Sequence, residues 1–274
     1  MSAAIELDGL IAGYGSHAVV GPLTMEIEAG EFVAVLGPNG SGKTTLLRVL
    51  LGQLDPLAGS VRIAGHAPHA HGLDVGYVPQ HRDFDPSLPI RGRDLVELGV
   101  NGHRWGLPWT RAVERRAVDE ALAVIGATGY ADAALGMLSG GEQQRLRIAQ
   151  ALLGAPKVLL CDEPLLALDP ARQAEVVALI DAQRRQGDAA VLFVTHEINP
   201  ILPVVDRVLY LVGGRAAIGT PEEVLTTEQL SALYGADVEV IEAGGRILVV
   251  AGEDSASDLL GHHHDHDHED HPWA

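Results

Sequence analysis

The alternation of apolar and polar positions predicts an α/β core that is interrupted by a helical segment. Residues 5–37 read as short strands broken by glycine-rich turns, and the last of these strands is "EFVAVLG". A helix follows, with Leu46, Leu47, Leu50 and Leu54 on one face, and it stops at Asp55-Pro56. Residues 60–80 return to strand character and end in "VGYVPQ". The first third of the chain therefore predicts strands on either side of one helix.

The pattern changes between residues 82 and 152, where helical periodicity dominates. Two buried-strand patterns come next, "KVLLCDE" and "AAVLFVTHE", with the helix "PARQAEVVALIDAQRRQG" between them. Strand, helix and strand in this order predict a right-handed parallel crossover. A hairpin pattern, "VEVIEAGGRILVV", precedes an acidic, histidine-rich end. We therefore expect a core formed by residues 1–81 and 153–235, a helical insert at 82–152, a hairpin at 236–252 and a disordered tail at 253–274.

Composition narrows the function classes. The net charge of -18 argues against nucleic-acid binding, which needs a basic face, and residues 253–274 alone hold seven carboxylates. No apolar run approaches the roughly 18 residues of a membrane span, and the N-terminus lacks the pattern of a signal peptide. The single cysteine, Cys161, excludes an internal disulfide. These features predict a protein of a reducing compartment, the cytoplasm.

The segment "GPNGSGKT", Gly37–Thr44, follows a strand and opens a helix, which is the context of a phosphate-binding loop. Glycines let the backbone curl so that successive N–H groups point at phosphate oxygens. Lys43 is one of only two lysines in the chain. Its charge suits the β- and γ-phosphates of a nucleotide, and the Thr44 hydroxyl suits Mg²⁺. The loop predicts nucleotide binding.

Two adjacent carboxylates end the strand "VLLCDEP". A carboxylate at the carboxyl end of a buried parallel strand points into the crevice where phosphates lie. Asp162 fits a ligand of Mg²⁺ or its water, and Glu163 is placed to orient or deprotonate an attacking water. His196 ends the next strand and fits a hydrogen-bond donor to the γ-phosphate. The alternatives are two solvated acids in a turn and a structural histidine.

Two further side chains are candidates near the nucleotide. Gln80 ends another strand, where a neutral amide suits Mg²⁺ or the lytic water; the alternative is an ordinary polar loop residue. Tyr14 lies among glycines in "AGYG" and is a candidate platform for adenine stacking, or else a tyrosine packed on the first strands.

The stretch "LSGGEQQRLRIAQALL" raises a question, because its Ser-Gly-Gly opens onto a helix N-terminus. Bare N–H groups and the positive end of a helix dipole form a second anion site.

These motifs together resemble the ATPase subunit of ABC transporters. The phosphate loop, Gln80, "LSGGE", "CDEP", "LALDP" and His196 occur in that family's order, and the resemblance covers residues 5 to about 235. It implies a P-loop ABC ATPase core with an N-terminal antiparallel β-layer and an inserted α-helical subdomain. It also implies ATP and Mg²⁺ as cofactors, with Thr44, Gln80 and Asp162 as the Mg²⁺ ligands.

The resemblance explains the second anion site. In this family two subunits pack head to tail, so that one copy's Ser-Gly-Gly closes over the ATP of the other. Asp169 of "LALDP" would lie at the seam, and the helical insert would dock an integral membrane permease. The implied ATP-binding residues are Gly37, Pro38, Asn39, Gly40, Ser41, Gly42, Lys43, Thr44 and Thr45 of one copy and Ser139, Gly140 and Gly141 of the other.

The segments "VGYVPQHRDFDPSLPI" and "GTPEEVLTTEQLSALYG" resemble the importer branch that handles zinc and manganese, or its iron-siderophore and cobalamin relatives. This branch implies a peripheral subunit on the cytoplasmic face of the membrane, which serves an extracytoplasmic substrate-binding protein through the permease. A soluble ABC protein of DNA repair or translation and a regulatory module without turnover remain alternatives. The tail interleaves imidazoles with carboxylates, which suit Zn²⁺ unless the tail is a polar end without ligands. Its candidate ligands are His262, His263, His264, His266, His268 and His271.

Overall fold

The computed structural model describes residues 3–68, 74–80, 85, 89–101, 112–166 and 168–251. The chain divides into two compact units, Met1–Val224 and Leu225–Ala274. The histidine-rich tail and most of residues 81–88 lie outside the described residues. The division of the chain expected from the sequence remains a prediction.

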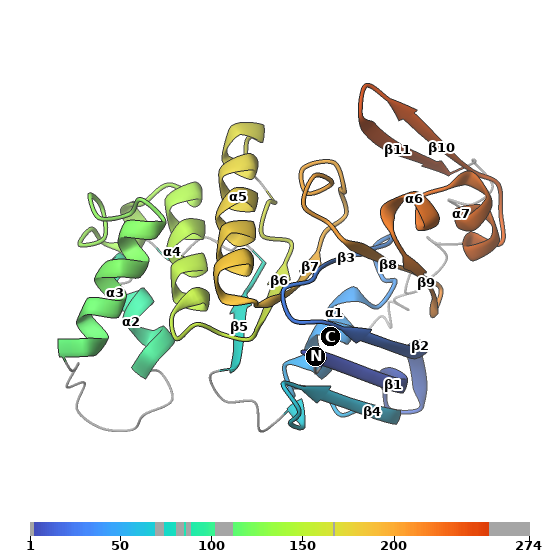
Figure 1. Cartoon of the computed structure of the whole chain (residues 1–274), viewed down its shortest axis with the longest axis horizontal. Helices are drawn as coiled ribbons and strands as arrows, with labels where there is room; N and C mark the ends of the chain where they lie inside the picture. Colours follow the sequence, from blue (N-terminus) through green and yellow to red (C-terminus); the bar gives the residue numbers. More distant parts are fainter. Residues whose placement is uncertain are drawn as a thin grey trace, which may run out of the picture. The chain divides into compact units, whose positions relative to one another are not determined.

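A six-stranded sheet with the order β5-β6-β7-β3-β8-β9 forms the centre of the first unit (Figure 1). Neighbouring strands are parallel except for the last pair, β8 and β9. The strands are β3 Phe32–Leu36, β5 Val75–Val78, β6 Val158–Asp162, β7 Ala190–Val194, β8 Arg207–Val212 and β9 Arg215–Gly219. The core strands β3 and β7 are buried at every position, which explains their unbroken apolar sequences.

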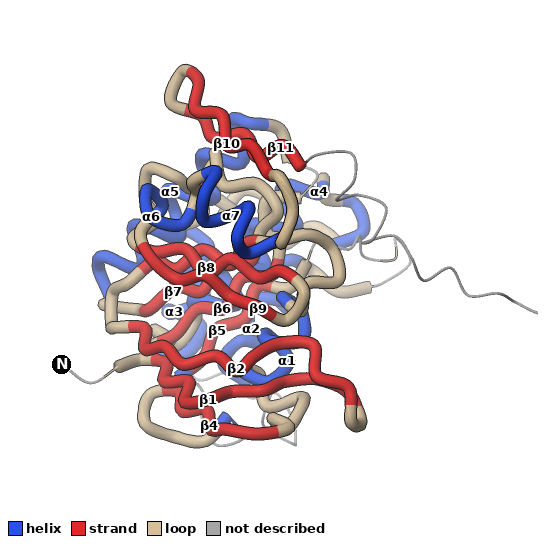
Figure 2. Tube along the Cα trace, turned by 90° about the vertical axis from the view of Figure 1, so that its right-hand side faces the viewer, coloured by secondary structure: helices blue, strands red, loops and turns tan. Residues whose placement is uncertain are grey.

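A second, three-stranded antiparallel sheet has the order β2-β1-β4. Its strands are β1 Ile5–Tyr14, β2 His17–Ile27 and β4 Ala58–Ile63. Helix α1, Lys43–Leu50, buries Leu46, Leu47 and Leu50 in one apolar cluster with residues of both sheets. Figure 2 shows α1 beside these strands. Two sheets with helices between and around them confirm the predicted α/β fold with an antiparallel N-terminal layer.

The helical insert has its own apolar cluster, which is centred on Val96, Val118, Leu122 and Leu146. Its elements are α2 Gly92–Asn101, α3 Ala112–Val124, η3 Leu135–Met137 and α4 Gly140–Leu152. Helix α4 also packs on the edge strand β5. The insert therefore lies against the strand that leads to Gln80.

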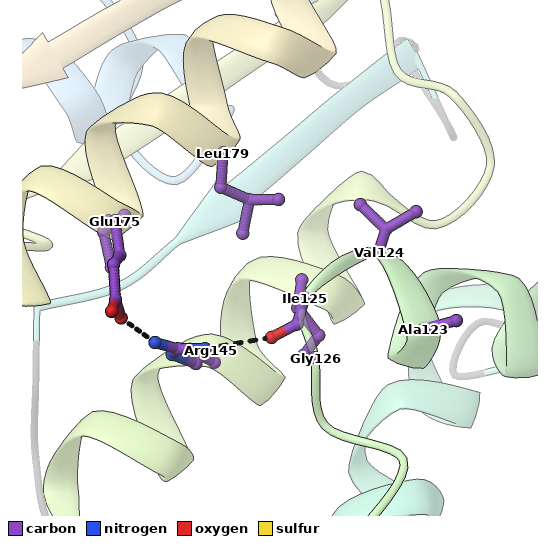
Figure 3. Close-up of a pocket in the computed structure, with 8 residues that line it drawn as sticks. Ala123, Val124, Ile125, Gly126, Arg145, Glu175 and Leu179 are labelled. Atoms are coloured by element: carbon purple, nitrogen blue, oxygen red, sulfur yellow. Dashed lines mark hydrogen bonds and ion pairs between the residues drawn. The ribbon is translucent and has the colours of Figure 1, made fainter.

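Helix α5, Pro170–Gly187, connects β6 to β7 and contacts the insert. Arg145 of α4 forms an ion pair with Glu175 of α5 and donates a hydrogen bond to the Ile125 carbonyl at 3.3 Å (Figure 3). A cavity of about 270 Å³ lies at this junction, between α3, α4 and α5. Arg145 thus ties the insert to the core helix that follows Asp169.

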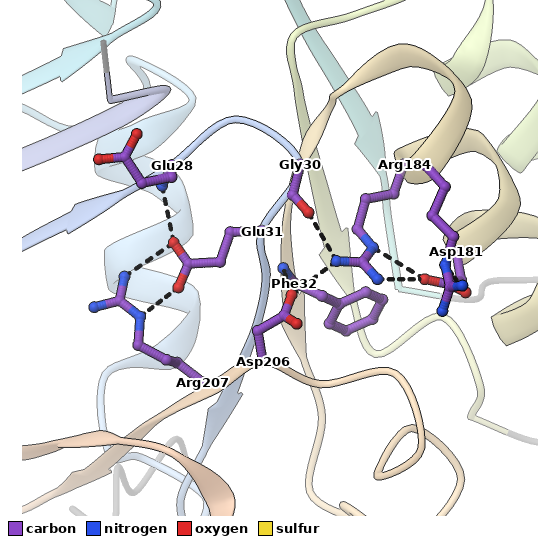
Figure 4. A network of polar contacts seen from close by, with 9 residues as sticks. Glu28, Gly30, Glu31, Phe32, Asp181, Arg184, Asp206 and Arg207 are labelled. Carbon is purple, nitrogen blue, oxygen red and sulfur yellow. Dashed lines mark hydrogen bonds and ion pairs between the residues drawn. The ribbon is translucent and has the colours of Figure 1, made fainter. Parts of the chain in front are cut away.

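A polar network fixes the amino ends of the central strands (Figure 4). Arg184 of α5 donates to the Gly30 carbonyl and to Asp206, each at 2.7 Å, and also pairs with Asp181. Asp206 in turn accepts a hydrogen bond from the Phe32 amide at 2.7 Å. This network anchors α5 and β8 at the start of β3, so the phosphate loop emerges from a strand held at its other end.

None of the helices in the described part of the chain has the length and apolar content needed to span a membrane. A short helix, α6 Pro221–Val224, ends the first unit. The second unit contains α7 Thr227–Tyr234 and an antiparallel hairpin of β10 Val238–Ala243 and β11 Arg246–Ala251. The Ser231 hydroxyl of α7 exchanges two hydrogen bonds with the Val238 backbone, each at 3.0 Å, which holds the hairpin to its helix.

Candidate functional site

The phosphate loop is preformed by glycine geometry. Gly37 has φ +141°, and a Cβ there would lie 2.1 Å from the Leu211 carbonyl oxygen, so no other residue fits. Gly42 caps α1 with φ +101° and supplies no side-chain hydrogen bond, which leaves the first N–H groups of the helix without a side-chain cap. The Ser41 hydroxyl is buried and has no partner among the described residues. Bare helix donors and an unused hydroxyl fit a phosphate.

Lys43 is 6% exposed and folds back on its own loop. Its Nζ donates to the carbonyl oxygens of Gly37 at 2.7 Å and Pro38 at 2.8 Å. Burial lowers the pKa of Lys43, while the charges of Glu163 and Asp162 act in the opposite direction. The Lys43 ammonium therefore lies against the loop carbonyls, close enough to Glu163 and Asp162 to interact with their charges.

The two acids leave β6 in different environments. Asp162 pairs with Val194 in the ladder, whereas Glu163 has φ +45° and turns out of the strand while its amide donates to the Val194 carbonyl at 2.9 Å. Burial, and next the charge of Glu163, raise the pKa of Asp162. Glu163 Oε2 accepts a hydrogen bond from Gln80 Nε2 at 3.0 Å. Two predicted site residues from distant segments are thus in direct contact.

Most of the other predicted site residues line two cavities. Thr44, Gln80 and Asp162, which are the predicted Mg²⁺ ligands, line one cavity of about 360 Å³. Glu163 and His196 line a second cavity of about 90 Å³. His196 is exposed and follows β7, which lies between β6 and β3 in the sheet. The histidine therefore emerges between the acids and the phosphate loop.

The chemistry of the first cavity suits Mg²⁺ held with a nucleotide. Among the described residues, no cluster of three His, Cys, Asp or Glu side chains is placed to hold a metal by itself. Mg²⁺ needs no such cluster, because it keeps several waters and binds through one or two protein oxygens plus phosphate. One hydroxyl, one amide and one carboxylate meet that requirement.

Tyr14 ends β1 and is 46% exposed. Its hydroxyl accepts a hydrogen bond from Arg48 Nη1 at 2.8 Å. Sequence reasoning missed Arg48, although its spacing of four residues from Thr44 places both on one face of α1. It also missed Tyr77, whose hydroxyl lies 3.5 Å from Asp162 Oδ2. Burial, followed by the charge of Asp162, raises the pKa of Tyr77 to about 12.

The Ser-Gly-Gly segment is built as a helix cap. Ser139 caps α4, and Gly140 and Gly141 are its first residues. Glu142 Oε2 accepts hydrogen bonds from the Ser139 amide at 2.8 Å and the Ser139 hydroxyl at 2.7 Å. This capping box could have been read from the Ser-x-x-Glu spacing. None of Ser139, Gly140 and Gly141 lines the cavity of Thr44 and Asp162 or that of Glu163 and His196.

Asp169 is likewise a helix cap. Its Oδ1 accepts hydrogen bonds from the amides of Ala171 and Arg172, each at 3.0 Å, at the start of α5. Within one chain the structure thus joins the phosphate loop, Gln80, the acids and His196, and it leaves the Ser-Gly-Gly segment outside the cavities that they line.

Comparison with known proteins agrees with this geometry. Residues 20–166 match the family model described as ABC transporter. The zinc import ATP-binding protein ZnuC of Roseobacter denitrificans is 34% identical over 231 residues, which is 84% of this chain and 84% of that protein. Its namesake in Yersinia enterocolitica is 32% identical over 271 residues, 99% of this chain and 95% of that protein.

Solved structures show the same fold. A chain of a metal-chelate type ABC transporter in an inward-facing conformation superposes with a TM-score of 0.76 at 27% identity, covering 91% of this chain and 96% of that one. The cbiO1 protein of Clostridium perfringens, part of the ABC transporter complex cbiONQ, superposes with a TM-score of 0.71 at 27% identity, covering 85% of this chain and 94% of that chain.

Proposed function

This chain belongs to the ABC transporter family as an ATP-hydrolysing subunit, and from that premise we propose that it energises the import of zinc. Zinc is proposed as the cargo because the chain is similar to zinc import ATP-binding proteins over 84% to 99% of its length. Manganese, and the cargo of the metal-chelate type transporter that shares its fold, are the competing readings.

We assign the chemical roles from the contacts within the site. The Gly37–Thr45 segment binds the phosphates through backbone N–H groups, and Lys43 moves its charge from the loop carbonyls to the β- and γ-phosphates. Thr44, Gln80 and Asp162 would hold Mg²⁺, which supplies charge neutralisation at the phosphates. Tyr14 stacks on the adenine and is steadied by Arg48.

Glu163 is the proposed general base. Its carboxylate reaches the cavity shared with His196, where it orients the attacking water and takes its proton. His196 donates a hydrogen bond to the γ-phosphate. The hydrogen bond from Gln80 holds Glu163, so engagement of Gln80 at the phosphates would free the carboxylate for water. The loop at residue 80 thereby links the base to the helical insert.

We further propose that the working unit is a dimer with ATP at its seam. The support is that Ser139, Gly140 and Gly141 cap α4 but do not line the cavities of the phosphate loop and the acids. Their donors would close over the γ-phosphate bound by a second copy, with Asp169 at the contact. Loss of that phosphate on hydrolysis removes the bonds that favour the closed pair.

The proposed partners are an integral membrane permease that docks on the helical insert and, through it, an extracytoplasmic substrate-binding protein. This arrangement places the chain on the cytoplasmic face of the membrane.

The histidine-rich tail is the second proposed metal site, and it lies outside the described residues. We propose that the six histidines between His262 and His271 bind Zn²⁺ and so buffer or sense it near the transporter. Isothermal titration compares the full chain with one cut after residue 252. The full chain should take up more Zn²⁺, and equal uptake by both would contradict the proposal.

Substitution of the base tests the central claim. Glu163→Gln removes the proton acceptor and keeps the side-chain size, so ATP turnover should fall by about 10²-fold or more while ATP binding persists. Size-exclusion chromatography should then show an ATP-locked dimer. Turnover near the wild-type rate would show that another residue activates the water.

The cargo is tested in cells that lack this chain. The wild-type chain should restore ⁶⁵Zn²⁺ uptake and growth in zinc-limited medium, and Glu163→Gln should not. Restoration of siderophore-bound iron or cobalamin uptake without zinc uptake would contradict a zinc importer and leave the ATPase assignment intact.

A further inference from the structure

We propose that Glu142 is a positioning residue that holds the Ser139 hydroxyl in a conformation unable to donate to phosphate, and so weakens ATP-driven pairing of two copies. The inference rests on the proposed dimer and deepens it, because it identifies a group that opposes closure. It begins with the hydrogen bonds of one carboxylate oxygen.

Glu142 Oε2 accepts two hydrogen bonds from the same residue, one from the Ser139 amide at 2.8 Å and one from the Ser139 hydroxyl at 2.7 Å. A hydroxyl has a single hydrogen. Since that hydrogen points to Glu142, the Ser139 oxygen offers only lone pairs to an approaching phosphate. The return contact from the Glu142 amide to the Ser139 hydroxyl is long, at 3.4 Å.

The negative charge of the Glu142 carboxylate also repels a phosphate that approaches Ser139. The hydrogen bonds from the Ser139 side chain and backbone hold the pKa of Glu142 below its usual range, so the group is ionised at neutral pH. Arg172 and Arg145 lie near enough to favour this charge, but both are paired with Glu175. A phosphate arriving at Ser139 therefore meets a nearby negative charge.

Glutamine at this position would weaken both effects. Its carbonyl oxygen can take the place of Oε2 and keep the bond from the Ser139 amide that caps α4, but a neutral oxygen holds the hydroxyl hydrogen less strongly than a carboxylate does. The hydroxyl hydrogen is then given up to the γ-phosphate more easily, and one negative charge is removed. Both sites of a symmetric dimer gain, so Glu142→Gln should tighten ATP-dependent pairing by roughly tenfold.

The experiment measures the dimer dissociation constant by sedimentation of the full-length chain with ATP and Mg²⁺. Glu163→Gln serves as the parent because it does not consume the nucleotide. Glu223→Gln is the matched control, since Glu223 forms the same kind of capping box with Thr220 at α6, with Oε2 2.9 Å from the Thr220 amide. We expect tighter pairing for Glu142→Gln and no change for Glu223→Gln.

A role limited to capping α4 predicts no gain in pairing. The weaker cap would lower the melting temperature and leave pairing unchanged or weaker, and that result in a parent that still pairs with ATP would overturn the inference alone. If the parent does not pair with ATP at all, the proposed dimer fails and the inference with it.

A double-mutant cycle identifies the group through which Glu142 acts. In a Ser139→Ala background there is no hydroxyl to release, so most of the gain from Glu142→Gln should disappear. A gain that persists in full would mean charge repulsion without positioning, and the assignment of Ser139 would be wrong.

Discussion

At Asp162 the ionised carboxylate that Mg²⁺ binding requires lowers the stability of the folded chain. The Asp162 side chain is half-buried beside Glu163, and its pKa is raised mainly by that burial. A raised pKa means that folding favours the protonated form, so the ionised carboxylate at neutral pH costs stability in the nucleotide-free chain. The fold retains this charge because a Mg²⁺ ligand must be ionised.

We therefore predict that Asp162→Asn stabilises the nucleotide-free chain while it abolishes ATPase activity. The melting temperature should rise by about 2 °C, the shift that roughly 1 kcal/mol gives in a domain of this size. Between the unfolded and folded pKa values, stability of the wild type increases as pH falls, so the gain of the variant should shrink toward acid pH. Calorimetry at pH 7.5 and pH 4.5 measures both. A variant less stable than wild type at pH 7.5 would contradict the argument.

For single residues, the sequence predicted those site residues that belong to a contiguous motif. It missed those whose role depends on a contact between distant segments. Lys43 and Thr44 follow from a strand, a glycine loop and a helix that are contiguous. Tyr77 could not be identified, because its contact with Asp162, 85 positions later in the chain, requires β5 to pair with β6 in the register that places Tyr77 opposite Leu160.

At the scale of elements, glycines decide how closely helices of the insert approach. A Cβ at Gly99 of α2 would lie 2.5 Å from the Gln150 carbonyl oxygen of α4. That neighbour is backbone and cannot move aside as a flexible side chain would. The contact between α2 and α4 thus depends on the missing side chain.

Gly99→Ala should therefore destabilise the insert by about 1–3 kcal/mol, the usual cost of overpacking. In an ordinary helix the same change stabilises by up to about 1 kcal/mol, so the sign of the effect is diagnostic. Chemical denaturation measures it, and hydrogen exchange should locate the loss in α2 and α4.

Gly187, the last residue of α5, is the matched control for this substitution. A Cβ there would meet only the end of the flexible Gln183 side chain, at 3.9 Å. Gly187→Ala should be neutral or stabilising. Equal effects at both positions would show that α2 does not pack on α4 as described.

The pattern of apolar residues predicted the existence and type of most of these elements, because buried strands and amphipathic helices carry different periods. It predicted that β6 and β7 are parallel and joined by one helix, but it could not place β3 in the sheet. Strand β3 precedes both in the chain and lies on the other side of β7, so His196 emerges next to the phosphate loop. Order depends on packing between segments far apart, which no local pattern encodes.

For the whole molecule, the pH dependence of stability at alkaline pH is a sum of opposing groups. Burial raises the pKa of Tyr77 to about 12 and also raises that of Cys161, so stability falls as pH rises above their ordinary values near 10 and 9. Lys43 acts in the other direction, because its pKa is lowered from 10.5 and its burial cost disappears once it deprotonates. The net profile alone therefore identifies no single group.

Differences between variants separate these contributions. Tyr77→Phe removes one titrating proton, so between pH 10 and 12 its unfolding free energy should fall less steeply than that of the wild type, by up to about 1.4 kcal/mol per pH unit. Cys161→Ala should show a similar relief beginning about one pH unit lower, because the free thiol titrates first. Urea denaturation at half-unit pH steps gives the slopes. Identical slopes for wild type and Tyr77→Phe would mean that Tyr77 ionises in the folded chain as easily as in water, although it is half-buried on the edge strand β5 with its hydroxyl 3.5 Å from Asp162 Oδ2.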